Sequence, residues 1–181
     1  MTFKLLCSLM VICPLAGGCD EQDQGRYQSA GTQDNVAVYF SPQTDCRKLI
    51  ISQIREAQKS IHVQAYSFSS EKIARALVDA KKMGVKVVVI IDGTKAEGKS
   101  EANFLTKKGI DTYVDSEHEK AHNKVIMVDG KTIITGSFNF SDADEDSTAD
   151  NVLVIRDKPK LMDAYEENFQ AHLRHSKIHE R

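Results

Sequence analysis

Cysteine is scarce in the part of the sequence that can fold into a domain. Three of the four cysteines lie within the first 19 residues, which leaves Cys46 alone in the remainder of the chain. A lone cysteine cannot form an intrachain disulfide, so a disulfide framework is excluded there. The 181 residues, 41% of them hydrophobic, are instead enough to bury one core, and we expect a single α/β domain.

A strong excess of either charge is also absent. The formal net charge is -2 at pH 7. The molecule as a whole therefore gives no electrostatic reason to expect a nucleic-acid partner, and any basic surface must be local.

The N-terminal apolar run is too short for a permanent membrane span. It extends from Leu5 to Ile12, follows Lys4, and leads into small residues that end at Cys19. This order is typical of a secretory signal, so residues 1–18 are predicted to be a signal peptide that directs export from a bacterial cytoplasm. The ending LAGGC resembles a lipoprotein processing site, in which a lipidated Cys19 would anchor the protein to a membrane. Cleavage by the ordinary signal peptidase, which would give a periplasmic protein, is the alternative.

Residues 19–35 have almost no large aliphatic side chains and are predicted to form a flexible polar tether. A folded domain is expected to occupy residues 36–181. Hydrophobic patterns in its first half predict four strands, at 36–40, 61–68, 85–92 and 110–115. Helical spacing predicts three helices between them, at about 45–59, between Ser70 and Gly84, and between Ser100 and Gly109.

This alternation predicts a mixed, mainly parallel sheet with helices on both faces. The alternation of strands and helices then stops. Residues 121–141 contain two strand patterns joined at Asp129 and Gly130, a dipeptide typical of tight hairpin turns. A hairpin is therefore expected to be inserted in the sheet. A further strand at 151–157 and a helix beginning at Pro159 complete the predicted domain.

The predicted hairpin carries polar side chains at fixed offsets. His122 and Lys124 are two residues apart, so on a strand they project from the same side. The returning strand leads to Ser137 and Asn139, and Gly136 leaves room for a ligand or another backbone to approach. Imidazole, ammonium, hydroxyl and amide groups on one surface suit a tetrahedral anion such as phosphate.

A half-exposed hairpin with polar residues on its wet face is the plainer interpretation. The chain contains two other pairs with the same spacing, His118 with Lys120 and His175 with Lys177. Neither has an aspartate five residues after its lysine, whereas Lys124 is followed at that distance by Asp129. Only the pair at His122 therefore has the full set of spaced polar residues.

That full set, HNKVIMVDGKTIITGSFN, resembles the phosphodiesterase motif of the phospholipase D superfamily. The segments AYSFSSEKIARALVDAKKMGVKVVVIID and GSFNFSDADEDSTADNVLVI resemble its small single-motif branch, which includes secreted bacterial endonucleases. The resemblance extends from about residue 36 to residue 175. It implies a phospholipase D-like fold and a hydrolase that works without a metal ion or other cofactor.

The chemistry of such a hydrolase predicts a homodimer. A covalent mechanism needs a nucleophile on one side of phosphorus and a proton donor on the other, and the chain has one complete motif. A two-fold dimer would oppose two copies of His122, one attacking and one protonating the leaving oxygen. Lys124, Ser137 and Asn139 would bind the non-bridging oxygens.

Two aspartates are the remaining candidate catalytic residues. By the family pattern Asp129 is a supporting residue, and locally it shapes the turn. Asp150 stands where the family often has a glutamate before asparagine, and it is a candidate to orient His122 from behind.

Two substrates remain open on the sequence. A nuclease is favoured by the branch resemblance, whereas a phospholipase is favoured by the potential anchor at Cys19 and by the acidic residues between Asp142 and Asp150. A non-catalytic phosphate-binding module is less favoured because the motif is intact. No metal site is expected, although His172, His175 and His179 share one face of the last predicted helix.

Overall fold

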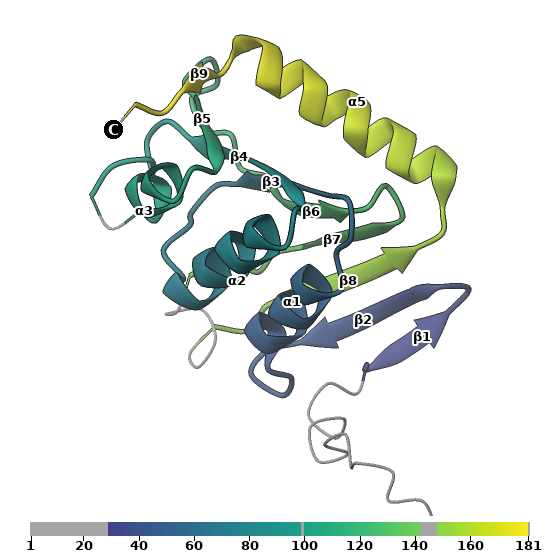
Figure 1. Cartoon of the computed structure of the whole chain (residues 1–181). Coiled ribbons are helices and arrows are strands. Elements are labelled where there is room, and N and C mark those ends of the chain that lie inside the picture. Colours follow the sequence, from purple (N-terminus) through teal and green to yellow (C-terminus); the bar gives the residue numbers. More distant parts are fainter. Residues whose placement is uncertain (1–28, 99, 142–147, 181) are drawn as a thin grey trace, which may run out of the picture.

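The structure of the chain is a computed structural model that describes residues 29–98, 100–141 and 148–180. The predicted signal peptide, Cys19 and most of the predicted tether lie outside these residues, as do residues 142–147 of the acidic segment. The described strands are β1 (Gly31–Gln33), β2 (Val36–Phe40), β3 (Ser60–Ala65), β4 (Lys86–Asp92), β5 (Asp111–Asp115), β6 (Lys124–Val128), β7 (Thr132–Gly136), β8 (Asn151–Arg156) and β9 (Lys177–Ile178). The described helices are α1 (Cys46–Arg55), α2 (Glu71–Lys82), α3 (Ala102–Lys107) and α5 (Pro159–His175) (Figure 1).

The strands form one sheet in the order β1-β2-β8-β7-β6-β3-β4-β5-β9. The mixed α/β architecture is confirmed, but the prediction of a mainly parallel sheet is wrong. Only β3 with β4 and β4 with β5 pair in parallel among the described strands, and the other neighbours are antiparallel.

The reason for this difference is the place of the inserted hairpin. β2, β3, β4 and β5 run in one direction, as their helical connections require, but β8, β7 and β6 lie between β2 and β3. β6 and β7 are joined at Asp129 and Gly130, which both have positive φ angles, 55° and 66°. Two such residues are typical of the turn that closes a tight hairpin.

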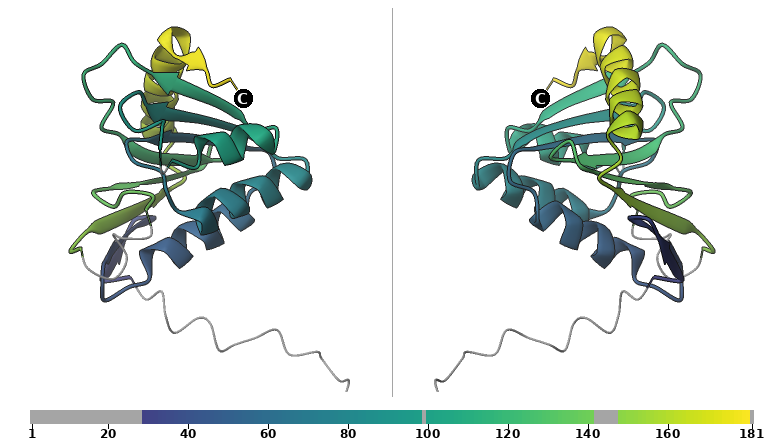
Figure 2. Two further views of the ribbon diagram at one scale, coloured as in Figure 1. Left: turned by 90° about the vertical axis from the view of Figure 1, so that its left-hand side faces the viewer. Right: turned by 90° about the vertical axis from the view of Figure 1, so that its right-hand side faces the viewer.

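Helices cover both faces of the sheet, as predicted. α1 and α2 lie on one face and α5 on the other (Figure 2). The larger hydrophobic core contains Ile50, Leu77 and Ile126, and the smaller one contains Val88, Met127 and Phe169 of α5. Because both faces are covered, all five residues of β6 are buried.

Local sequence signals set the ends of the helices. Asp45 accepts a hydrogen bond from the backbone N–H of Lys48 at the start of α1, and Ser70 caps α2 in the same way. Gly84 follows α2 with a φ of 93°, a conformation that favours glycine. Pro159 occupies the first turn of α5, where no intrahelical N–H is needed.

The end of the predicted tether is ordered, which corrects its boundary. Residues 31–33 form β1 and pair with β2. Asp34 and Asn35 both have positive φ, which asparagine and aspartate tolerate, and they close a hairpin in which β1 itself buries no side chain. β1 is held by backbone hydrogen bonds to β2 and not by buried side chains, so the polar composition of residues 31–33 did not predict a strand.

None of the helices in the described ranges combines the length and the apolar composition needed to cross a membrane.

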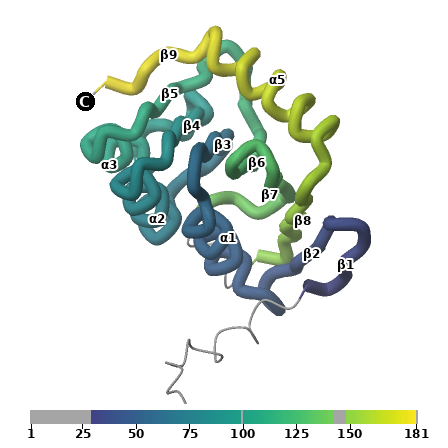
Figure 3. Tube along the Cα trace, turned by 45° about the vertical axis from the view of Figure 1, so that its right-hand side comes forward, coloured from purple at the N-terminus to yellow at the C-terminus, as the bar shows by residue number. Residues whose placement is uncertain are grey.

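The strand ends that carry the motif lie on one side of the sheet. β2, β3, β4, β5 and β7 end on this side, and β6 and β8 begin there (Figure 3). The predicted motif residues His122 and Lys124 precede or begin β6, and Ser137 follows β7. The topology therefore brings distant parts of the chain to this side, which is where ligands commonly bind in open α/β sheets.

Candidate active site

His122 and Lys124 lie side by side, as the sequence predicts. Nζ of Lys124 is 3.1 Å from Nδ1 and 3.4 Å from Nε2 of His122, and it also donates to the backbone carbonyl of His122 at 3.2 Å. The Lys124 side chain is buried, whereas His122 is exposed. An ammonium group has only donors, so a hydrogen bond between the two side chains requires a ring nitrogen without a proton.

The electrostatics of the site favour the neutral form of His122. Partial desolvation of its ring and the positive charges of Lys124 and Lys120 lower the pKa of His122, while the carboxylate of Asp92 acts in the opposite direction. The ring is thereby kept in the form that has a free lone pair, which is the form that can attack an electrophile.

Tyr66, directly after β3, forms one wall of the site. Its ring centroid lies 4.2 Å from that of His122, and the ammonium groups of Lys124 and Lys95 lie 5.0 Å and 5.4 Å from its ring. Both contacts are at cation–π distance. The Tyr66 ring therefore contacts the ammonium groups of Lys124 and Lys95 as well as the imidazole of His122.

Asp92, the last residue of β4, positions the segment that carries His122. One carboxylate oxygen accepts from the backbone N–H of Ala121 at 2.6 Å, and the other accepts from the backbone N–H of Thr94 at 2.9 Å. Asp92 is almost fully buried. It fixes the backbone immediately before His122, and charge-assisted bonds of this kind are stronger than neutral ones.

Ser137 forms a network with residues at the start of β8. Its Oγ donates to Oδ1 of Asp150 at 2.5 Å and accepts from the backbone N–H of Asn151 at 3.1 Å. Gly136 permits this arrangement, because a Cβ there would lie 2.1 Å from the carbonyl oxygen of Asn151. The sequence offered two reasons for a glycine here, room for a ligand or room for another backbone. The structure shows the second, the close approach of the backbone of Asn151.

The predicted contact between Asp150 and His122 is not formed. Asp150 accepts from Ser137 instead, and its other carboxylate oxygen, Oδ2, is buried without a hydrogen-bond partner among the described residues. The Ser137 proton is in turn committed to Asp150, so in this conformation Ser137 has none to offer a phosphate oxygen. Oδ1 of Asn139 is also buried without a partner in the described part of the chain.

Asp129 is a structural residue and does not reach the site. It lies five residues after Lys124 along β6, roughly 17 Å away at the usual rise per strand residue. Its carboxylate accepts from the backbone N–H groups of Gln58, Lys59 and Ser60 at 2.7–2.9 Å. Asp129 thus stands at a fixed distance from Lys124 because its hydrogen bonds hold the loop between α1 and β3. A catalytic role for Asp129 is not supported.

Two surface cavities lie on the same side of the sheet. One, of about 760 Å³, is lined by Phe40, Ser41, Asp150 and Asn151. The other, of about 370 Å³, is lined by Ser67, Thr94 and Lys95, among others. In the strand order β6 and β7 lie between them, so the cavities flank the strand ends that carry the motif.

Tyr66, Asp92 and Lys95 are site residues that the motif did not reveal. Asp92 could have been found from its place at the end of a predicted strand, because polar residues at such ends commonly form sites. Tyr66 and Lys95 follow strand ends too, but the motif does not show that Tyr66 contacts His122 or that Lys95 contacts Tyr66.

Comparisons with known proteins agree with this geometry. Residues 50–173 match a family model described as "Cardiolipin synthase, PLD-like domain". A phospholipase D of Rickettsia prowazekii is 40% identical over 139 residues, which cover 76% of this chain and 67% of that protein. A mitochondrial cardiolipin hydrolase of Xenopus laevis is 31% identical over 71% of this chain and 62% of its own.

The fold is likewise similar to a solved structure. The crystal structure of Nuc, a phospholipase D family member from Salmonella typhimurium, has a TM-score of 0.77 and 37% sequence identity, and the match covers 81% of this chain and 98% of that one. NucT from Helicobacter pylori, at 22% identity and a TM-score of 0.73, shares the fold. The chain thus belongs to the phospholipase D superfamily and is one of its phosphodiester hydrolases.

Proposed function

We propose that the protein is a nuclease that hydrolyses phosphodiester bonds without a metal ion, through a phosphohistidine at His122. The observation that carries this proposal is the contact of the Lys124 ammonium with the neutral His122 ring, at 3.1 Å. A lone pair and a fixed positive charge in contact provide a nucleophile and a group that binds the non-bridging phosphate oxygens.

The reaction would proceed in two displacements. A ring nitrogen of the neutral His122 attacks phosphorus, the bond from phosphorus to the leaving oxygen breaks, and a second histidine, which begins in the protonated form, donates a proton to that oxygen. Water then attacks phosphorus, loses a proton to the second histidine, and breaks the phosphorus–nitrogen bond. The products are an alcohol and a phosphate monoester, and both histidines return to their initial states.

The second histidine is proposed to be His122 of another copy of this chain. In-line displacement puts the nucleophile and the proton donor on opposite sides of phosphorus, which one His122 cannot do. The exposed position of His122 on this side of the sheet leaves it accessible to a partner. A two-fold dimer that opposes these sides would supply both groups.

Nucleic acid is the preferred substrate because the positive charge is local. Lys95, Lys120 and Lys124 lie around Tyr66 and His122, although the whole chain has a formal charge of -2. A polymer substrate has phosphates on both sides of the bond that breaks, and clustered lysines bind such neighbours. The resemblance to the branch with secreted endonucleases supports the same choice.

A phospholipase is the second candidate. It is favoured by relatives named phospholipase D and mitochondrial cardiolipin hydrolase. A lipidated Cys19, if the protein is exported and anchored as the sequence predicts, would also keep the enzyme at a membrane surface.

One experiment distinguishes the nuclease from the phospholipase. Purified protein in EDTA is offered plasmid DNA, single-stranded RNA, and vesicles of phosphatidylcholine or cardiolipin. We expect cleavage of nucleic acid, release of no lipid head group, and loss of at least about 1,000-fold in rate for His122→Ala. Lipid hydrolysis with intact nucleic acid would reverse the choice of substrate. Circular dichroism in the same buffer shows that any inactive sample is still folded.

A further inference from the structure

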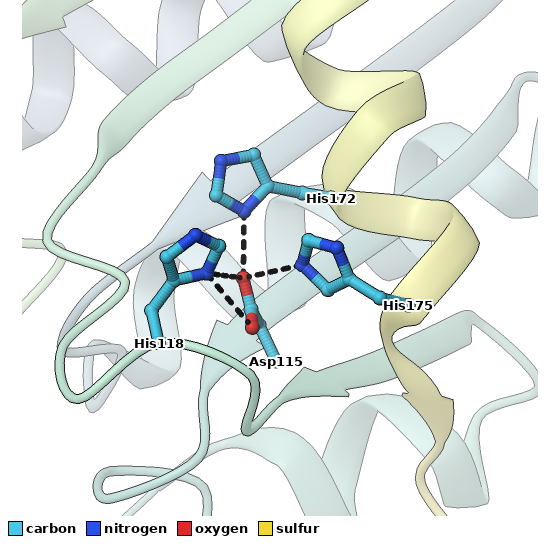
Figure 4. A group of neighbouring side chains, drawn as sticks. All are labelled: Asp115, His118, His172 and His175. Atoms are coloured by element: carbon cyan, nitrogen blue, oxygen red, sulfur yellow. Dashed lines mark hydrogen bonds and ion pairs between the residues drawn. The ribbon is translucent and has the colours of Figure 1, made fainter.

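A second cluster of ionisable side chains lies outside the active site. It consists of Asp115 at the end of β5, His118 in the following loop, and His172 and His175 in the last turn of α5 (Figure 4). Each residue offers one potential ligand atom, and these four atoms all lie within 4.8 Å of one another. The sequence pattern grouped His179 with the two helical histidines, but Nε2 of His179 lies 3.0 Å from Oδ1 of Asn103 instead.

All three imidazoles point at the carboxylate of Asp115. Oδ2 of this residue lies 2.6 Å from Nδ1 of His172, 3.2 Å from Nε2 of His175 and 3.2 Å from Nδ1 of His118. The Asp115 side chain is completely buried, whereas that of His118 is 47% exposed. The end of β5 with its following loop and the last turn of α5, which are remote in sequence, thus converge on one buried oxygen.

The spacing of these atoms is close to that of a tetrahedral metal site. Zinc binds imidazole nitrogen and carboxylate oxygen at about 2.0–2.2 Å, so neighbouring ligand atoms of a tetrahedron are about 3.3–3.5 Å apart. Two of the three nitrogen–oxygen separations, at 3.2 Å, are almost this long. The four ligand atoms lie within 4.8 Å of one another, so an ion would draw the imidazoles from the Asp115 oxygen toward a common centre, with the largest change of distance to that oxygen at His172.

Hydrogen bonding alone leaves the cluster incompletely satisfied. Oδ1 of Asp115 already accepts from the backbone N–H of Glu117 at 3.1 Å. Nε2 of His175 is buried and lies 3.2 Å from Oδ2 of Asp115, an ion-pair distance, but without the alignment of a good hydrogen bond. Buried polar atoms are normally well paired, and a metal ion at the centre of the cluster would give this nitrogen a directed bond.

We propose that Asp115, His118, His172 and His175 bind one divalent transition-metal ion of the zinc class. Three imidazoles with one carboxylate suit zinc, whereas magnesium and calcium prefer sites made of oxygen atoms. Four protein ligands complete a tetrahedron and leave no open position for a substrate. The site is therefore structural and separate from the chemistry of His122.

The ion would stabilise the loop that delivers the nucleophile. Residues 116–123 connect β5 to β6 and carry both His118 and His122. The far end of this loop is held by the bond from Ala121 to Asp92, and the metal would hold its beginning. The same ion would join the end of α5 to β5, next to the short pairing of β9 with β5.

The experiment measures metal binding by the purified full chain. Protein stripped with a chelator is titrated with Zn²⁺ by calorimetry and with Co²⁺ by visible absorption, and its melting temperature is followed. We expect one ion per chain, the strong visible bands of tetrahedral Co²⁺, and a higher melting temperature with Zn²⁺. His118→Ala is the main variant because its ring is half exposed, and it should weaken Zn²⁺ binding by at least about 100-fold.

Matched variants separate this site from other zinc ligands. His179→Ala removes a histidine from the same C-terminal segment, and His122→Ala removes the proposed nucleophile; both should bind Zn²⁺ like the wild type. Asp115→Asn should lose binding, and its circular dichroism shows whether it is folded. Binding that is unchanged in His118→Ala, or a wild-type melting temperature that does not respond to Zn²⁺, would overturn the proposal whatever the enzymatic activity proves to be.

Discussion

The pKa of His122 is lowered by partial desolvation of its ring and, beyond that, by the charges of neighbouring side chains. Lys124 contacts the ring directly, while Lys120 acts from an exposed position two residues before it. Because both are positive, the imidazole stays neutral to a lower pH than an isolated histidine would. The pH range of activity should therefore depend on Lys124 and Lys120 as well as on His122 itself.

Lys120→Gln tests this dependence. The pKa of His122 is lowered by partial desolvation and then by the lysines, so removing one positive charge should raise it. The neutral nucleophile would then be lost at a higher pH, and the acidic limb of the profile of kcat/KM against pH should move to higher pH. Lys86→Gln, at the opposite end of β4, is the matched control and should leave the limb in place. An unchanged limb in Lys120→Gln would exclude this electrostatic contribution.

At the scale of residues, the sequence predicted the pair of His122 and Lys124 because a strand's alternation fixes their common side. It predicted that Asp129 is a supporting residue that shapes the turn, but not the backbone groups that Asp129 binds, nor that Asp150 bonds to Ser137 in place of His122. Asp150 bonds to Ser137 across two strands, and Asp129 caps a loop some 70 residues earlier in the chain. Both outcomes depend on sheet order, which the spacing of a motif does not contain.

At the scale of elements, Asp129 ties the hairpin of β6 and β7 to the loop before β3. Partial burial acts to raise the pKa of Asp129, but its three backbone hydrogen bonds and the charge of Lys59 outweigh it and hold the pKa below the usual value. The ionised carboxylate is therefore the form that stabilises the fold. This contribution is complete above the pKa of an unfolded aspartate and is lost as the pH falls through the lower, folded value.

Asp129→Asn should lower the free energy of unfolding by about 1–3 kcal/mol at neutral pH. The difference from the wild type should shrink in acid, because there the wild type loses the same charge. Urea denaturation at several pH values measures both effects. Asp163→Asn, an exposed position on α5, should change stability by less than about 0.5 kcal/mol. A difference between Asp129→Asn and wild type that does not vary with pH would show that the charge is irrelevant.

Most elements were predictable because their patterns are local. The helices between Ser70 and Gly84 and after Pro159 match α2 and α5, because the Ser70 cap, the proline in the first turn of α5 and the apolar faces of both helices lie in the sequence itself. The direction of most pairings was not predictable, since it depends on where the hairpin enters the sheet. β1 was not predicted either, because its residues are exposed and show no hydrophobic alternation.

At the scale of the whole molecule, the proposed active unit contains two chains. Co-expression of wild-type and His122→Ala subunits would give hybrid dimers with a single nucleophilic histidine. If both histidines are required, an equal mixture should retain about one quarter of the wild-type activity, the fraction of dimers that pair two intact chains at random. Activity that falls only in proportion to the mutant fraction, or a fully active monomer by light scattering, would contradict the shared site.

The fate of the N-terminus is the second prediction at this scale. Export with lipidation should give a mature chain that begins at Cys19, carries lipid, and is found with the membrane fraction. Mass spectrometry of that fraction identifies both the first residue and the modification. A soluble, unmodified chain that still begins at Met1 would contradict export by either route.

The two ends of the sheet bear on how copies of this protein can associate. β1 at one edge has three residues and β9 at the other has two, and all five are exposed. Unpaired backbone N–H and C=O groups along an edge strand are a template on which a neighbouring chain can add a strand. The short edge strands β1 and β9 present few such groups. The molecule is thereby protected against open-ended polymerisation through its sheet, even at the high local concentration that confinement to a membrane surface would impose.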